Sequence, residues 1–254
     1  MGAGHSHPLH VHGHSGLHRM APHVKLLALC AYAVAVATTP PGAWLAFAAL
    51  ALLGAAAVAA SGLPLGFVAS RALIVTPFLV SALVIPFAAS GHDTSLGPLS
   101  WSSVGVVAGL SIAVRALLGV VASIVVAGTT ELPRLLAGLE RLRVPAAITA
   151  IASFMLRYLE LVAGELERMH AAMTARGHDP RWLGQVRPMA MASGALFVRT
   201  YERGERVHLA MVARGFTGHL PRLHEDVATA RQWLVAGTWS ALAVAVAVSA
   251  RVIQ

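Results

Sequence analysis

Residues 104–127 read VGVVAGLSIAVRALLGVVASIVVA and contain one charged side chain, Arg115. About twenty apolar residues in a helix are enough to cross a hydrocarbon core of roughly 30 Å. The rest of the chain agrees with this stretch, because 57% of its 254 residues are hydrophobic and 12% are charged. A soluble domain carries about a quarter charged residues. The sequence therefore predicts an integral membrane protein.

Four other apolar runs have a similar composition and are separated by turn-forming residues. They cover residues 24–39, 43–60, 72–89 and 232–252. In lipid, each backbone polar group has to be satisfied within the segment, which a helix achieves. We therefore expect an all-α polytopic membrane protein with about five transmembrane helices. The first four lie within residues 24–129 and the last within residues 231–254.

Charge is concentrated ahead of the last apolar run. Residues 131–231 hold 14 of the 19 Lys and Arg residues and 10 of the 11 acidic residues. Glycine and proline divide this part into a short helix ending near Arg143 and two longer helices over about 145–174 and 189–212. The acids interleave with the arginines, and no aromatic residues accompany them as a platform, so the net charge of +8 does not indicate a nucleic-acid partner. We expect amphipathic helices over residues 130–230.

The distribution of positive charge predicts how the chain is oriented in the cell membrane. Arg19 and Lys25 precede the first apolar run, whereas residues 91–103, between the third and fourth runs, contain no Lys or Arg. Positive residues are enriched in cytoplasmic loops. Four spans separate the N-terminus from the arginine-rich segment, so both lie on one side. We expect the N-terminus and residues 130–230 in the cytoplasm, and the C-terminus outside.

One tripeptide occurs twice in the charged segment. Ala175-Arg176-Gly177 and Ala213-Arg214-Gly215 lie 38 positions apart, and each closes a predicted helix. Glycine after the last turn is the ordinary left-handed stop of a helix, and Arg favours the negative end of the helix dipole. On this interpretation the tripeptides only terminate the two helices. Alternatively, the duplication indicates two equivalent contacts with a two-fold partner outside the lipid, because the planar Arg fork donates several hydrogen bonds at once.

With these motifs the chain resembles the transmembrane T component of energy-coupling factor (ECF) transporters, of the cobalt type. The resemblance extends from about Pro22 to the C-terminus. It is carried by the apolar spans, the Thr130-Glu131-Leu132 segment that precedes the charged region, the Arg157-Tyr158 helix, the paired motifs and the final hydrophobic helix. It implies two ATP-binding-cassette ATPases and a membrane-embedded, metal-binding S component as partners, besides the lipid bilayer. It also implies that the residues coupling the chain to the ATPases are Ala175, Arg176, Gly177, Ala213, Arg214 and Gly215.

The first 23 residues form a histidine-rich leader without a continuous apolar core. Its imidazoles are interspersed with Gly, Ser and Pro, at His5, His7, His10, His12 and His14, followed by His18 and His23. Such a chain can gather around Ni²⁺, Co²⁺, Cu²⁺ or Zn²⁺, or it can be a tail that binds no metal in the cell. We expect residues 1–23 to be a flexible tail.

Arg115 lies midway along the run at 104–127, where a charge exposed to lipid costs about 2.5–3.5 kcal/mol. We expect it to face protein or a water-filled crevice, or else to reach the membrane surface through a shifted span.

The sequence contains no catalytic constellation. Lys25 is the only lysine and lacks the Gly-Lys-Ser/Thr context of a Walker A loop. We therefore expect a non-enzymatic subunit, without a cofactor or a metal site of its own. The resemblance implies that it links ATPase movement to an S component in cobalt uptake that supplies cobalamin biosynthesis. Two alternatives stay open: a nickel-type T component, and a self-sufficient secondary metal permease, which would need ionisable residues in its spans.

Overall fold

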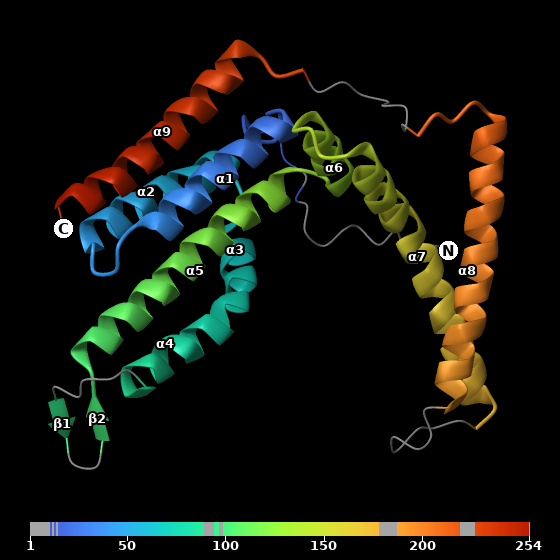
Figure 1. The fold of residues 1–254 in the computed structure, drawn as a ribbon, viewed down its shortest axis with the longest axis horizontal. Helices are drawn as coiled ribbons and strands as arrows, with labels where there is room; N and C mark the ends of the chain where they lie inside the picture. Colours follow the sequence, from blue (N-terminus) through green and yellow to red (C-terminus); the bar gives the residue numbers. More distant parts are fainter. Residues whose placement is uncertain are drawn as a thin grey trace. The chain divides into compact units, whose positions relative to one another are not determined.

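The computed structural model describes residues 11, 13, 15–88, 94–96, 99–177, 187–218 and 227–253. In chain order its elements are α1 (Pro22–Thr38), α2 (Trp44–Ser61), α3 (Leu65–Ala72), the 3-10 turn η1 (Leu73–Val75), α4 (Thr76–Ala88), β1 (Thr94–Leu96), β2 (Leu99–Trp101), α5 (Ser103–Thr129), α6 (Leu132–Arg141), α7 (Ala146–Ala175), α8 (Arg187–Ala213) and α9 (Ala230–Ile253) (Figure 1). This confirms the prediction of an all-α membrane protein. A short antiparallel ribbon, β1 with β2, interrupts the predicted polar loop.

The chain forms two compact units. The first contains α1–α5, α9 and α6 as far as Gly138, and the second contains the remainder of α6 with α7 and α8. Gly138 lies against the start of α1, since a Cβ atom at this position would be 2.9 Å from Cβ of Pro22. The charged region predicted over residues 130–230 thus falls into a short part attached to the first unit and a helix pair that forms the second.

Small and aromatic side chains on α1, α2, α5 and α9 build the core of the first unit. Tyr32 on α1 is buried and donates a hydrogen bond from its hydroxyl to the carbonyl oxygen of Leu50 on α2, at 2.8 Å. Ala243 and Ala247 on α9 are buried in the same cluster, and alanine lets helix backbones approach closely. Elsewhere on these helices large apolar side chains are exposed, and Leu45 is 89% exposed. Such extended apolar surface suits contact with lipid.

Five helical segments of the described chain are long and apolar enough to cross a membrane: α2, the α3–α4 segment, α5, α7 and α9. The number of candidate spans agrees with the prediction, but α7 is among the five and α1 is not. α1 has 17 residues, about 25 Å of helix, and is slightly shorter than the others. α7 qualifies through its apolar first half, whereas Glu165, Glu167 and Arg168 follow in its second half. The cytoplasmic placement of α7 therefore stays a prediction.

The third span begins earlier than the sequence predicts. The expected range is 72–89, whereas α3 starts at Leu65 and continues through η1 into α4. The 3-10 turn ends at Val75, two residues before Pro77. The ring of Pro77 lacks an N–H and clashes with the carbonyl four residues earlier, at Leu73. Arg71, which marks the predicted start, lies inside α3 with its guanidinium carbon 3.5 Å from the centre of the Phe67 ring. This cation–π contact accommodates the charge on an otherwise apolar helix.

Part of the histidine-rich leader is packed on the bundle. Val11 and Leu17 contact the buried cluster formed by α2, α3 and α5, and the Val11 N–H donates to the carbonyl oxygen of Gly128 at 3.0 Å. His18 is buried, with Nε2 3.0 Å from the carbonyl oxygen of Val11 and Nδ1 2.7 Å from Oγ of Ser15. The expectation of a flexible tail does not hold for this part. His5, His7, His10, His12 and His14 lie outside the described residues.

Candidate functional site

Helix α7 ends in a left-handed glycine turn. Ala175 is its last residue, Arg176 follows as the cap, and Gly177 has a φ of +80°. The Gly177 N–H donates to the carbonyl oxygen of Thr174 at 2.9 Å, which satisfies one of the acceptors left open at a helix end. Glycine adopts this left-handed φ without strain. The predicted helix stop is confirmed here.

Helix α8 ends in the same way. Ala213 is its last residue, Arg214 is the cap, and Gly215 has a φ of +84°. Two hydrogen bonds complete the end: Gly215 N–H to the Val212 carbonyl at 2.9 Å, and Phe216 N–H to the Met211 carbonyl at 3.0 Å. This pair of bonds defines a Schellman motif. The second predicted stop is confirmed as well.

The two arginines are exposed. Neither guanidinium has a hydrogen bond or an ion pair with any other residue that the structure describes. Their charge near the helix dipole contributes about 0.3–1 kcal/mol to each helix end. Each guanidinium carries five N–H donors, which suit contacts with acceptor groups. The geometry therefore provides two cationic helix ends, each followed by a glycine with a left-handed φ.

The structure does not bring the two motifs together; it separates them by a crossing of helices. α7 and α8 run antiparallel within the second unit (Figure 1), so their C-terminal ends point in opposite directions. At the crossing, the Glu165 carboxylate lies 3.3 Å from Nη1 of Arg199 and 3.7 Å from Nη1 of Arg203. The Glu165 side chain is 14% exposed, whereas the side chains of Arg199 and Arg203 are 60% and 36% exposed, so that water reaches the contact from the arginine side. Sequence patterns missed it, because no local spacing joins residues 34 and 38 positions apart.

The short helix α6 also ends in a left-handed turn, but on a non-glycine residue. Arg143 has a φ of +66°. The Val144 N–H donates to the carbonyl oxygen of Leu139 at 3.2 Å, in the same bonding pattern as at the end of α8. An L-residue in this region costs about 1–2 kcal/mol. Three successive helices of the charged region are thus followed by a residue with a left-handed φ, and at Arg143 this conformation is strained.

Thr130, in the Thr130-Glu131-Leu132 segment, takes part in a buried polar contact that the sequence patterns did not predict. Lys25 on α1 is 4% exposed, and its Nζ donates to Oγ1 of Thr130 at 2.6 Å and to the carbonyl oxygen of Thr129 at 3.1 Å. In the structure Thr130 is the C-cap residue that follows α5, which ends at Thr129. The signal available in the sequence was the uniqueness of Lys25. Its ammonium joins α1 to the point where the chain leaves the bundle.

Arg115 faces the interior of the bundle, as one of the sequence alternatives requires. Its Nη2 donates to the carbonyl oxygen of Thr39, at the C-terminal end of α1, at 2.6 Å. Arg251 on α9 donates from Nε to the neighbouring carbonyl, that of Thr38, at 2.9 Å. Cations at a helix C-terminus stabilise its open carbonyls. Arg115 is thus a contact within the bundle that fixes the far end of α1.

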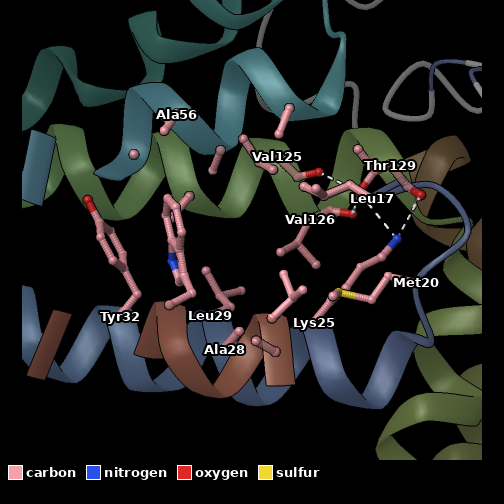
Figure 2. A pocket seen from close by; sticks show the side chains of 17 residues that line it. Leu17, Met20, Lys25, Ala28, Leu29, Tyr32, Ala56, Val125, Val126 and Thr129 are labelled. Atoms are coloured by element: carbon pink, nitrogen blue, oxygen red, sulfur yellow. Dashed lines mark hydrogen bonds between the residues drawn. The ribbon is translucent and has the colours of Figure 1, made fainter. Parts of the chain in front are cut away.

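A cavity of about 380 Å³ lies between α1, α2, α5 and α9. Figure 2 shows apolar side chains such as Leu29 and Val125 along its walls, with the hydroxyl of Tyr32 towards one end and the ammonium of Lys25 towards the other. Lys25 is the only charged residue among the seventeen that line it. A divalent cation entering this space would meet hydrocarbon and a positive charge. The side chains that line the cavity include no carboxylate, imidazole or thiolate.

Known proteins resemble this chain over most of its length. A family model described as "CbiQ: Cobalt transport protein" matches residues 13–224. The cobalt transport protein CbiQ of Rhodobacter capsulatus is 32% identical over 203 residues, which are 77% of this chain and 78% of that protein. The energy-coupling factor transporter transmembrane protein EcfT of Bacillus selenitireducens is 26% identical over 224 residues, 82% of each chain.

A fused cobalt transport protein, CbiMQ of Methanocorpusculum labreanum, is 29% identical over 98 residues, which are 39% of this chain and 16% of that protein. The chain thus corresponds to a small part of the fused relative and to most of the unfused ones. Apolar helices suited to crossing a membrane and these long matches lead to one conclusion: this multi-pass membrane protein belongs to the CbiQ family of cobalt transport proteins.

Proposed function

We propose that the chain is the energy-coupling T component of an ECF-type importer, which transmits the movement of two ATPases to a substrate-binding S component. The observation that carries the proposal is the pair of matching helix ends on α7 and α8, each with an exposed, unpaired Arg among the described residues. Arg is suited to this role because its fork binds carboxylates and carbonyl groups bidentately. Arg176 and Arg214 are the coupling residues in this proposal.

The proposed mechanism is mechanical. Closure of an ATPase pair on ATP changes the separation of the two surfaces that hold Arg176 and Arg214. Because α7 and α8 are joined near Glu165, that change alters the angle or the position of the helix pair. The exposed apolar side chains on the first half of α7, including Ile148, Ile151 and Met155, are between 57% and 67% exposed. They are the surface through which we expect the movement to reach the S component.

Cobalt ion is the proposed substrate, and nickel ion is the alternative. The names of the relatives support cobalt, since the family model and the Rhodobacter protein are both described as cobalt transport proteins. In this scheme the ion is held by the S component, so that the T component supplies no ligands. The chain itself performs no catalysis, and ATP hydrolysis belongs to the partner subunits.

A secondary metal permease is the rival function. It would carry the ion through its own helices, along ionisable side chains that bind and release it. The cavity in the bundle argues against this, because its only charged lining residue is the cation Lys25. Arg115 is the charge that the sequence places midway along a span, and it donates to the carbonyl oxygen of Thr39 at the end of α1.

Purification and transport separate the two functions. The tagged chain, extracted from its own cells in mild detergent, should bring down ATPase subunits in a ratio of two per chain together with a small membrane protein. Uptake of radioactive Co²⁺ and Ni²⁺ by cells expressing the whole complex then identifies the ion. Metal transport by the purified chain alone in liposomes, without ATP, would establish the permease instead.

A further inference from the structure

The chain connects the two compact units at two points. It leaves the first unit after Gly138, within α6, and it returns to that unit at residue 225, shortly before α9 begins. In the proposed function, a movement of residues 139–224 reaches the transmembrane helices along the chain at these two points. The contacts that hold the two points in place therefore bear on the coupling.

The first connection point is held by residues that precede α1 or form its first turn. The N–H of Val11 donates to the carbonyl oxygen of Gly128, near the end of α5, at 3.0 Å. Lys25 reaches the next two residues of the chain through the hydrogen bonds described above. A Cβ atom on Gly138 would lie 3.0 Å from the backbone nitrogen of His23. The end of α5 and helix α6 are thus both packed on this segment.

The second connection point is held by the same segment. The side-chain amide of Gln232, in the first turn of α9, donates from Nε2 to the carbonyl oxygen of Arg19 at 3.2 Å. Its Oε1 accepts from the N–H of Ala21 at 3.3 Å. The ring of Trp233 lies beside that of His23, with their centroids 5.8 Å apart. One amide therefore satisfies an acceptor and a donor of the leader backbone at once.

Apolar side chains support these hydrogen bonds. Ala21, Val24 and Ala236 are buried in one cluster, and Ala228, which precedes α9, packs against it. The leader thus buries apolar surface against the start of α9 as well as against the bundle. Leu17 and Met20 line the end of the bundle cavity at which Lys25 reaches Thr129 (Figure 2).

The ring of His18 organises the leader ahead of these contacts. Its Nε2 and Nδ1 atoms lie within hydrogen-bond distance of the Val11 carbonyl oxygen and of Oγ of Ser15, at 3.0 Å and 2.7 Å. A Cβ atom on Gly13 would lie 2.7 Å from Cε1 of the same ring. Because both ring nitrogens are engaged, the ring cannot move aside without breaking a hydrogen bond. His18 thereby holds Val11 where it can bond to α5.

We infer that residues 11, 13 and 15–25 form a clasp, which fixes the two points at which the chain leaves and re-enters the first unit. Gln232 and His18 are its positioning residues. The inference rests on the proposed function. Chain segments with few buried contacts open locally at little cost, so that loose connection points would absorb part of a movement of residues 139–224. The clasp ties α5 and α9 to the start of α1, and the movement then displaces these helices together.

The first test measures whether Gln232 holds the clasp, by amide hydrogen exchange of the full-length chain in its complex in nanodiscs. Gln232→Leu keeps the size of the side chain and removes both hydrogen bonds. Exchange in peptides covering residues 15–25 and 228–236 should rise about tenfold. Arg231→Gln changes the exposed neighbouring residue in the same turn of α9, and it should exchange as the wild type does.

Gly13→Ala and Gly16→Ala test the other end of the clasp as a matched pair. The Cβ atom added at Gly13 presses on the ring of His18, whereas one added at Gly16 has no neighbour within 4 Å. Exchange in residues 15–25 should rise in Gly13→Ala and stay unchanged in Gly16→Ala. This pair also decides the matter if Gln232→Leu does not assemble. Unchanged exchange in Gln232→Leu and Gly13→Ala would show that no clasp exists.

The second test measures coupling in proteoliposomes that contain the complete complex. Gln232→Leu and Gly13→Ala should each lower the maximal Co²⁺ import per ATP hydrolysed at least about twofold, the lower end of effects seen for residues that link two sites. The Co²⁺ concentration for half-maximal import and the amount of ATPase retained should stay at the wild-type values, because neither variant changes the proposed ion or ATPase contacts. Arg231→Gln and Gly16→Ala should match the wild type in all three measurements.

Wild-type import per ATP in variants whose exchange has risen would overturn the coupling role of the clasp and leave the proposed function standing. Loss of ATPase retention in these variants would assign the leader to ATPase binding and would also overturn the inference. If the wild-type chain itself retained no ATPases, the proposed function would fail, and the exchange measurements would still decide whether the clasp exists.

Discussion

Gly109 allows α4 and α5 to pack with their backbones in contact, and Gly109→Ala should force them apart. A Cβ atom at this position would lie 2.5 Å from the carbonyl oxygen and 3.2 Å from Cα of Ala82. These are backbone atoms of α4, so they cannot rotate away as a side chain would. Overpacking of this kind costs about 1–3 kcal/mol. The same substitution also gains about 0.5–1 kcal/mol because alanine favours a helix over glycine.

Gly119→Ala provides the matched control. Gly119 lies in the same helix, and an added Cβ atom there has no neighbour within 4 Å. The gain in helix propensity is common to both variants, so that the difference in their free energies of unfolding isolates the overpacking, about 1–3 kcal/mol. Unfolding of the purified protein in mixed micelles, followed by tryptophan fluorescence, measures that difference. Equal stabilities of Gly109→Ala and Gly119→Ala would refute the close approach of α4 and α5.

Three further predictions concern the charged region and its orientation. Gly215→Ala should weaken ATPase binding, because an L-residue at φ +84° costs about 1–2 kcal/mol. Gly194→Ala, which adds a Cβ atom in open space within α8, should leave binding unchanged. Equal binding by the two variants would contradict this prediction. Arg143→Gly should raise the free energy of unfolding by about 1 kcal/mol, by relieving the strained φ of +66°, and a lower melting temperature would count against it. In a Cys30→Ala background, an impermeant maleimide added from outside should label Ser95→Cys and leave Ser193→Cys unlabelled, and outside labelling at 193 would overturn the proposed orientation.

Local patterns predicted much of the secondary structure. The apolar runs and their breaks gave the helices of the bundle to within a few residues, because in lipid the backbone has little alternative to a helix. The ends of α7 and α8 followed from glycine chemistry at Gly177 and Gly215. The start of α3 could not be predicted in this way. Arg71 marks the boundary of an apolar run in the sequence, and only the structure shows that its guanidinium lies over the ring of Phe67.

The contacts that hold the parts together were beyond such patterns. Lys25 reaches Thr130 across 105 positions of sequence, and Arg115 reaches Thr39 across 76. The ion pair of Glu165 is specified by how α7 crosses α8, which depends on packing along both helices. The leader was judged from its histidines, although its apolar residues Val11 and Leu17 are what attach it to the bundle.

The most direct test of the central claim is whether the chain loses its ATPases when both motif arginines are reversed. Arg176→Glu with Arg214→Glu should abolish co-purification of the ATPases while the protein still inserts and remains monodisperse, because reversing a charge in a desolvated contact costs more than the ~2–5 kcal/mol of truncating it. Arg187→Glu, which reverses an exposed charge at the start of α8 outside both tripeptides, should leave co-purification intact. If the double variant still retains its ATPases and imports metal at the wild-type rate, the two helix ends are not the coupling site.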